Sequence, residues 1–231
     1  MAIYVTSDLH FNHTNICNLE RYMLDRNLMQ NITNVEEYNN MVVRRINEVV
    51  DEKDTLYILG DFAFGNFQAM KHWLSKLNGY KILILGNHDK FTAEEAVRNI
   101  GFDEAYEGPI YLPGSKGKII LSHYPLLECY NNPYIAFNLH GHLHGSVLDL
   151  DNYINIGFGV NHFKPVDLER FIKKSNGVGK SRREKFLSEW YAEHQIFRDK
   201  SREDLVLDHR GKINLEETLK LRDSKEGNPS N

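Results

Sequence analysis

The chain has 231 residues, of which 41% are hydrophobic, so it can bury the core of one large domain with or without an appendage. Cys17 and Cys129 are its only cysteines, which excludes a disulfide framework and favours two reduced thiols. No apolar run approaches the roughly 18 residues of a membrane span, and the first residues follow a strand pattern and not a signal peptide. We therefore expect a soluble cytoplasmic protein without a membrane partner. The formal charge of −4 identifies no partner by itself, but residues 1–172 hold 14 basic against 21 acidic side chains, and such an acidic body needs bound cations to accept phosphate.

The first hundred residues alternate strand-like and helix-like segments. Short apolar runs, the first beginning at Ile3, favour strands that are buried on both faces. Between these runs, helices are predicted over residues 14–23, 34–50, 67–77 and 92–100. Asn34 and Glu37 form a capping-box signature at the start of the second helix, and Thr92 opens the fourth in the same way. This alternation is typical of a doubly wound α/β layer.

Strands and turns dominate from Ile110 onward. Residues 111–121 predict a hairpin, and further strands are expected near 147–150 and 153–157. A helix that begins at Asp167 closes this part of the chain.

The composition changes after Asn176-Gly-Val-Gly179, which interrupts the pattern. A charged helix is predicted from Ser181, and a last short helix near 215–221. We therefore predict a main domain over residues 1–175 and a charged, mainly helical extension over residues 176–231. The aromatic side chains of this extension are expected to pack on the main domain or on a second subunit, so the oligomeric state stays open.

Five apolar runs each end on an Asp, Asn or His. They lead in chain order into the segments SDLH, GDFAFG, GNHD, SHYP and HGHLH. In open α/β sheets, ligands bind beyond the carboxyl ends of the strands. We therefore expect one site to collect the metal-type side chains of these segments, which are Asp8, His10, Asp61, Asn87, His123, His142 and His144.

The residue types at this site restrict the metal. Carboxylate oxygen, imidazole nitrogen and amide oxygen suit Mn²⁺, Fe, Co²⁺, Ni²⁺ or Zn²⁺, and fit neither an all-oxygen calcium cage nor a cysteine zinc site. Asp61 lies on a tight turn after Gly60, and its two carboxylate oxygens can bridge two ions. Gly141 is expected to permit an unusual backbone turn just before His142. Seven ligands are enough for two metal sites that share one bridging carboxylate.

The ordered set of segments resembles the calcineurin-like metallophosphoesterase superfamily. The matching motifs are Asp8-Leu-His10, Gly60-Asp61, Gly86-Asn87-His88-Asp89, His123 and Gly141-His142-Leu143-His144. The resemblance covers roughly residues 1–172, and the stretches SDLHFNHTNI, LGDFAFGN, LSHYPL and NIGFGV resemble a subgroup of small bacterial and phage phosphoesterases. It implies an α/β fold in which two sheets pack face to face and are flanked by helices, an α/β/β/α sandwich.

The resemblance also implies a role for each motif residue. One ion would be held by Asp8, His10, Asp61 and His144. The other would be held by Asp61, Asn87, His123 and His142. A metal-bound hydroxide would attack phosphorus, His88 would be the general acid for the leaving oxygen, and Asp89 would orient the His88 ring or raise its pKa. Mn²⁺ is the ion expected first, before Fe, Zn²⁺, Ni²⁺ or Co²⁺.

Other polar residues near the motifs carry less specific signals. His13, three residues after His10, and Arg21 are candidate contacts for the substrate phosphate, and Lys164 is a further cation near a motif segment. Each competes with an ordinary solvated position. His140 shares the spacing of the histidine pair that follows it, but it is expected in the core or next to the ligands.

These observations predict a dinuclear, metal-dependent phosphodiesterase that acts on a small nucleotide or cyclic nucleotide. Phosphomonoester hydrolysis and cleavage of nucleic acid are the enzymatic alternatives. Nucleic-acid contact is not favoured, because acidic residues interleave with the basic and aromatic residues of the extension. A catalytically silent binding scaffold and a mononuclear zinc hydrolase are the remaining rivals. The presence of every motif ligand and of His88 argues against the scaffold.

Overall fold

The computed structural model describes residues 1–16, 32–114, 117–146, 148, 150 and 152–176. The chain forms two compact units, Met1–Ile196 and Phe197–Asn231, and all described residues belong to the first. Arg21, Cys17, most of the predicted 14–23 helix and the predicted extension lie outside the described residues. The helices among the described residues are too short or too polar to cross a membrane.

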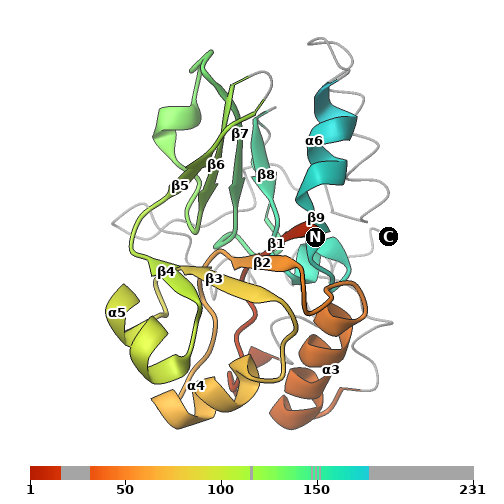
Figure 1. Cartoon of the computed structure of the whole chain (residues 1–231), viewed down its shortest axis with the longest axis vertical. Coiled ribbons are helices and arrows are strands. Elements are labelled where there is room, and N and C mark those ends of the chain that lie inside the picture. Colours follow the sequence, from red (N-terminus) through yellow and green to blue (C-terminus); the bar gives the residue numbers. More distant parts are fainter. Residues whose placement is uncertain (17–31, 115–116, 147, 149, 151, 177–231) are drawn as a thin grey trace, which may run out of the picture. The chain divides into compact units, whose positions relative to one another are not determined.

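The first sheet carries the three parallel strands that precede the earliest ligand motifs. It consists of β1 (Ile3–Thr6), β2 (Thr55–Ile58), β3 (Tyr80–Ile84), β4 (Glu104–Tyr106) and β9 (Val166–Asp167) in the order β4-β3-β2-β1-β9 (Figure 1). Strands β1 to β4 run parallel, and β9 joins β1 antiparallel at one edge. The carboxyl ends of β1, β2 and β3 therefore meet at one edge of the sheet.

Three of the predicted helices are confirmed, and two of them begin at the predicted capping residues Asn34 and Thr92. Asn34 caps α3 (Val35–Asn47) through a 3.0 Å bond from the Glu37 amide, and α4 spans Phe67–Leu74. Thr92 and Glu95 form the predicted capping box at α5 (Ala93–Glu95). The helix then widens into a π-turn, η1 (Ala96–Ile100), and ends at Gly101.

The second sheet contains the remaining motif strands. It consists of β5 (Ile110–Leu112), β6 (Lys118–Ser122), β7 (Ile135–His140) and β8 (Tyr153–Asn155) in sequential order. β5 and β6 form the predicted antiparallel hairpin, whereas β6, β7 and β8 run parallel. Leu148 and Leu150, the described members of the strand expected near 147–150, are not in a strand.

Two apolar layers hold these elements together and confirm the two-sheet sandwich. Helices α3, α4 and η1 bury side chains such as Tyr38 and Trp73 against the outer face of the first sheet. The two sheets share the second layer, in which Val5 and Leu59 lie with Phe137 and Leu139. Helix α6 (Leu168–Asn176) adds Phe171 to this inter-sheet layer. Among the described residues, the outer face of the second sheet packs on the short turn η2 (Leu127–Cys129).

Candidate metal centre

The ends of five strands, three in the first sheet and two in the second, converge on one site, as the sequence predicts. Backbone bonds join the loops that follow β1 and β2, because His10 N–H donates to the Asp61 carbonyl at 3.0 Å. The loops after β6 and β7 are joined in the same way, since Gly141 N–H donates to the His123 carbonyl at 3.0 Å. The Leu59 carbonyl links the two sheets, because it accepts from Ser7 Oγ at 2.6 Å and faces His123 Nδ1 at 2.8 Å.

The backbone at this site adopts a conformation that most residues avoid. Positive φ angles occur at five of the seven predicted ligands, namely Asp8 (59°), His10 (48°), Asp61 (55°), His142 (66°) and His144 (46°). Such a conformation costs roughly 1–3 kcal/mol per non-glycine residue and persists only where the surrounding structure imposes it. Their concentration at the strand ends indicates a site where side-chain placement outweighs local stability.

Gly60 and Gly141 are required here for different reasons. Gly60 has a φ of +84°, and a Cβ atom there would lie 2.6 Å from Gly86. The prediction that Gly141 permits an unusual turn is wrong, because its φ is not positive. A Cβ at Gly141 would instead collide with Ser7 Oγ and the Asp8 carboxylate. Gly141 therefore allows the loop after β7 to approach the loop after β1.

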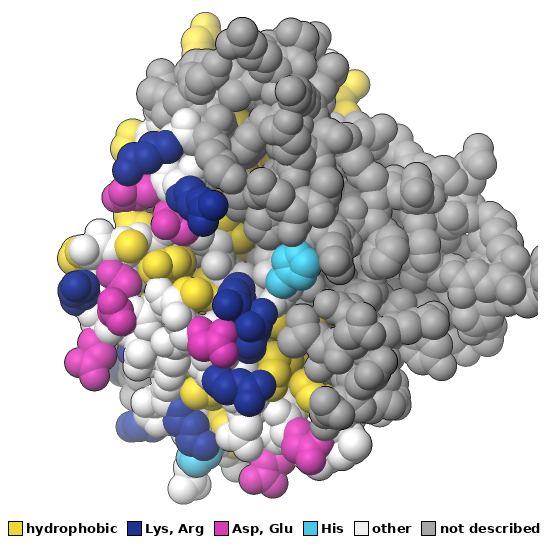
Figure 2. Space-filling view, turned by 90° about the vertical axis from the view of Figure 1, so that its right-hand side faces the viewer, with side chains coloured by type: hydrophobic (Ala, Val, Ile, Leu, Met, Phe, Trp, Pro, Cys, Tyr) yellow, Lys and Arg dark blue, Asp and Glu magenta, His cyan; other side chains and the backbone are white. Residues whose placement is uncertain are grey.

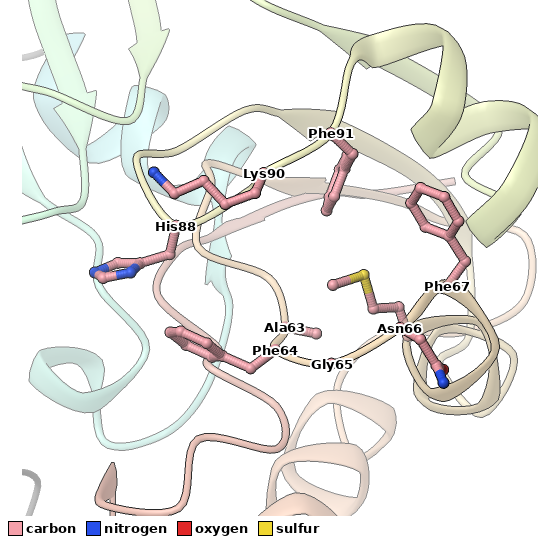
Figure 3. A pocket seen from close by; sticks show the side chains of 9 residues that line it. Ala63, Phe64, Gly65, Asn66, Phe67, His88, Lys90 and Phe91 are labelled. Atoms are coloured by element: carbon pink, nitrogen blue, oxygen red, sulfur yellow. The ribbon is translucent and has the colours of Figure 1, made fainter.

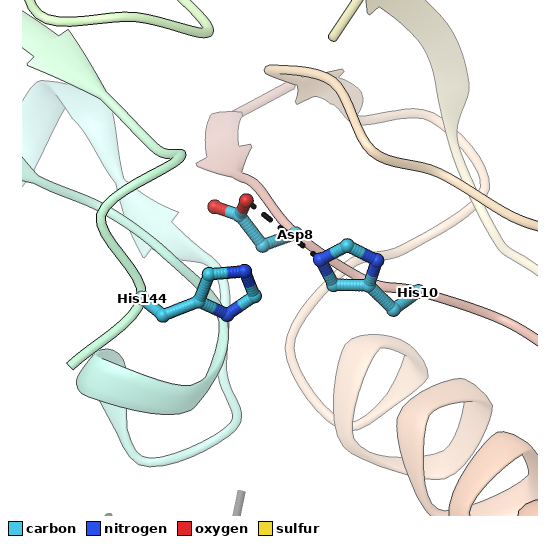
Figure 4. A group of neighbouring side chains, drawn as sticks. All are labelled: Asp8, His10 and His144. Carbon is cyan, nitrogen blue, oxygen red and sulfur yellow. Dashed lines mark ion pairs between the residues drawn. The ribbon is translucent and has the colours of Figure 1, made fainter. Parts of the chain in front are cut away.

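Asp8, His10 and His144 form the first candidate ligand group. One ligand atom from each lies within 4.8 Å of the others, and the rings of His10 and His144 stack at 5.0 Å (Figure 4). His10 is buried, yet neither of its ring nitrogens has a hydrogen-bond partner. Burial, together with the neighbouring histidines, holds the pKa of His10 well below its usual value. A buried neutral imidazole with an unshared lone pair fits a metal ion.

His123 belongs to a second group with Asp8 and Asp61, again within 4.8 Å. A carbonyl oxygen cannot donate, so the contact to Leu59 places a proton on His123 Nδ1. In the neutral ring, Nε2 then presents a lone pair to Asn87 Oδ1 only 2.8 Å away. Two acceptors at this distance repel each other unless a cation contacts both. The donor set therefore fits a metal ion here as well.

Asp61, a member of the second group, also faces the first. Its Oδ2 is 3.7 Å from His10 Nε2, and its Oδ1 is 3.6 Å from His123 Nε2. The two oxygens thus face different groups, as a bridging carboxylate requires. Asp8 belongs to both groups, although the resemblance implies a role for it at one ion only.

The remaining predicted residues around these groups are placed by ring contacts. The His142 amide donates to the Asp8 carboxylate at 3.1 Å, and its ring lies 5.1 Å from that of His123. The His13 ring lies 5.6 Å from that of His10, so it lines the site, and burial lowers its pKa. His88 is 44% exposed, and its Nε2 lies 3.9 Å from Asp61 Oδ2.

Comparison with known proteins decides the family. The sequence model of the calcineurin-like phosphoesterase family matches residues 1–225 of this chain. The chain belongs to the calcineurin-like phosphoesterase family. This membership, with the candidate ligand groups, supports metal-dependent hydrolysis of a phosphoester. The match runs past residue 175, so the predicted boundary between domain and extension stays a prediction.

Individual relatives of this phosphoesterase are consistent with the family. It is 33% identical over 183 residues to an uncharacterised protein of Methanocaldococcus jannaschii, covering 74% of this chain and 89% of that protein. It is 39% identical over 89 residues to the gene 66 protein of Mycobacterium phage L5, covering 37% of this chain and 39% of that protein. The crystal structure of a protein of unknown function from Aquifex aeolicus matches with a TM-score of 0.53 at 28% identity, over 75% of this chain and 98% of that one.

Asp89 of the phosphoesterase bonds to the backbone of the ligand loops. Its buried carboxylate accepts from the backbone amides of Asp61 (2.9 Å), Phe62 (3.0 Å) and Gly86 (2.8 Å). Burial raises the pKa of the Asp89 carboxyl, and the charge of Asp61 adds to this. These three bonds involve backbone amides and not the His88 ring. Asp89 therefore positions the turn that carries Asp61, and its predicted effect on the His88 ring stays a prediction.

We expect Asp89→Asn to lower metal affinity and kcat/KM by about 10–100-fold, as losses beside a metal site do. The asparagine oxygen can keep two of the three amide bonds, but its NH₂ would face the remaining donor, at a cost of about 1–3 kcal/mol. Chemical denaturation, a Mn²⁺ titration and steady-state kinetics measure the three effects.

Asp54→Asn is the matched control for Asp89→Asn. The Asp54 carboxylate is also buried and accepts from two backbone amides, those of Ala2 (2.7 Å) and Asp51 (3.1 Å), away from the ligands. Its replacement should lower stability and leave metal affinity unchanged. Equal losses of metal affinity in both variants would contradict a positioning role specific to Asp89.

Several residues around the centre carry no metal-type signal and were missed from the sequence. Asn155 donates to the His144 and Ser146 carbonyls, both at 2.8 Å, and so shapes the last ligand loop. Tyr124 packs its ring 4.6 Å from that of His142.

His140 is buried as predicted, and burial lowers its pKa to about 4. His142, two residues later, lies at the ligands instead, with its ring 5.1 Å from that of His123.

The described surface mixes charges of both signs. Figure 2 shows Lys and Arg side chains next to Asp and Glu on one face. Lys164 is a candidate contact for the substrate phosphate, and its Nζ lies 3.2 Å from Glu48 Oε2. The same carboxylate pairs with the Arg45 guanidinium at 3.1 Å. This part of the surface therefore lacks the single-sign patch that favours nucleic acid.

Proposed function

We propose that this protein is a dinuclear phosphodiesterase that hydrolyses a small nucleotide or cyclic-nucleotide diester. The position of Asp61 carries the proposal, because its two oxygens face His10 at 3.7 Å and His123 at 3.6 Å. A carboxylate whose two oxygens face different ligand groups can bridge a pair of ions. Mn²⁺ as the resident metal and a cytoplasmic location belong to the same proposal.

The chain would hold the two ions through the two ligand sets that the family resemblance implies, with Asp61 in both. When bound, the ions would activate a water molecule and stabilise charge on the phosphoryl oxygens. The Asp8 carboxylate is fixed for this role by the His142 amide, and Asp61 by the amide of His88, which donates to Oδ1 at 2.8 Å. These bonds hold the carboxylates in place before substrate arrives.

His88 is the proposed general acid. Its ring is partly exposed beside Asp61, so it can contact both a phosphate at the centre and the oxygen that leaves. His13 lines the same space, as its 5.6 Å ring contact with His10 indicates, and is the proposed phosphate contact. Arg21, the second proposed contact, lies outside the described residues.

A diester is favoured over a monoester by the state of nearby cations. A monoester dianion carries one more negative charge than a diester. The charge of Lys164 is already compensated, because its Nζ pairs with Glu48 Oε2 at 3.2 Å. Phosphomonoesterase, nuclease and silent-scaffold functions are the alternatives.

Metal analysis and a substrate panel test the function. We expect two Mn²⁺ per chain at saturation, and kcat/KM at least about tenfold higher for bis(4-nitrophenyl) phosphate than for 4-nitrophenyl phosphate. One ion per chain would indicate a mononuclear hydrolase, and the reverse preference a phosphatase. Absence of turnover above an Asp61→Asn blank, also with cyclic nucleotides, dinucleotides and short oligonucleotides, would leave the scaffold.

A further inference from the structure

A largely apolar pocket of about 390 Å³ adjoins the candidate metal centre. Figure 3 shows the rings of Phe64, Phe67 and Phe91 around it, with His88 and Lys90 on its rim. The rings of Phe67 and Phe91 meet edge to face at 6.2 Å. A pocket of this size and lining suits a planar apolar group.

The pocket shares two of its residues with the metal centre. The Phe64 ring lies 5.8 Å from that of His10 and 4.7 Å from that of His13, so it also borders the ligands. His88 lies 5.3 Å from Phe64, ring to ring, and its Nε2 lies 3.9 Å from Asp61. A molecule that contacts the centre can therefore reach the pocket past His88 and Phe64.

The backbone that forms the pocket is tied to the ligand loops. Phe64 N–H donates to the Phe11 carbonyl at 2.8 Å, and Gly65, with a φ of +110°, turns the chain toward the start of α4. The Asn66 side chain caps that helix at 2.9 Å. The wall is thus set by the same segment that follows Asp61, and its position is fixed relative to the centre.

We propose that this pocket binds an aromatic ring of the alcohol that leaves, either an aryl group or a nucleobase. The inference rests on the proposed function, because His88 protonates the oxygen of that alcohol and lies between centre and pocket. The phenylalanine rings would contribute stacking and burial of apolar surface. The pocket would thereby select diesters whose leaving alcohol carries a flat ring.

Binding of matched phosphonates tests the pocket without requiring turnover. 2-Phenylethylphosphonate and propylphosphonate share the anion and differ in the ring. We expect calorimetry on the Mn²⁺-loaded protein to give at least tenfold tighter binding of the phenyl compound, about 1.4 kcal/mol. 2-(Adenin-9-yl)ethylphosphonate is the third probe. Tighter binding of the adenine compound than of the phenyl compound identifies a nucleobase, and the reverse order identifies an aryl group.

Substitutions in the pocket test whether its phenylalanine rings cause the tighter binding of the phenyl compound. Phe91→Ala should reduce the phenyl-to-propyl ratio below about threefold, and Phe91→Leu, which keeps apolar packing, should reduce it in part. Tyr111→Ala, which removes a half-exposed ring on β5, should leave the ratio unchanged. Thermal melting confirms that each variant is folded.

Together, the binding and turnover results distinguish failure of the pocket proposal from failure of the proposed function. Turnover of bis(4-nitrophenyl) phosphate by a protein that binds all three phosphonates equally would overturn the pocket and leave the function standing. A ring preference that Phe91→Ala removes, in a protein without turnover, would support the pocket and overturn the function. A preference unchanged in Phe91→Ala and Phe67→Ala would also overturn the pocket.

Discussion

Asp61→Asn is expected to lower kcat/KM for a phosphodiester by roughly 1,000-fold or more, which is about 4 kcal/mol of transition-state stabilisation. Asparagine has one side-chain oxygen and no charge, so it cannot serve both ligand groups. The oxygen should stay at the Oδ1 position, where it accepts from the His88 amide at 2.8 Å. The amide NH₂ would then face His10. Kinetics with bis(4-nitrophenyl) phosphate and metal analysis measure the loss.

The same variant distinguishes loss of the site from loss of the fold. Without metal, Asp61→Asn removes a buried carboxylate close to Asp8, so its melting temperature should equal or exceed that of the wild type. The increase in melting temperature on Mn²⁺ addition should largely disappear. Asp103→Asn, at an exposed carboxylate outside the site, should keep this increase. Two bound ions and wild-type turnover in Asp61→Asn would refute a bridging role.

His88→Asn should have an effect that depends on the leaving group. With an alkyl alcohol as leaving group, loss of a general acid should lower kcat about 10²–10⁴-fold. With 4-nitrophenol, which leaves as a stable anion, the loss should be less than about tenfold. The variant keeps the backbone bond from residue 88 to Asp61, so metal binding should be retained. Parallel assays of one alkyl and one nitrophenyl diester give the comparison.

His72→Asn is the control for His88→Asn. His72 is exposed on α4 and lies outside the ligand groups, so its replacement should change neither rate. An equal fall for both leaving groups in His88→Asn would point to phosphate binding by His88 and against proton donation.

The ligand set could be predicted from sequence because its determinants are local. Apolar runs followed at once by Asp, Asn or His place those side chains at the carboxyl ends of parallel strands, and all five runs end where expected. Capping at Asn34 and Thr92 likewise depends on residues a few positions away. The resemblance, and not the residue pattern alone, gave the face-to-face packing of the second sheet.

Contacts between distant loops were decided only by the tertiary structure. The Asp89 carboxylate accepts from amides 27 and 28 residues earlier in the chain. Glycine is required at position 141 because Ser7 lies so close to it. No periodic sequence pattern predicts either contact. The role of Asn155 and the pocket beside His88 could not be predicted from the sequence for the same reason. The sequence by itself determined which side chains reach the strand ends, because strand and turn formation are local. The packing of two sheets determined which of those side chains face each other, because that geometry depends on the whole inter-sheet core.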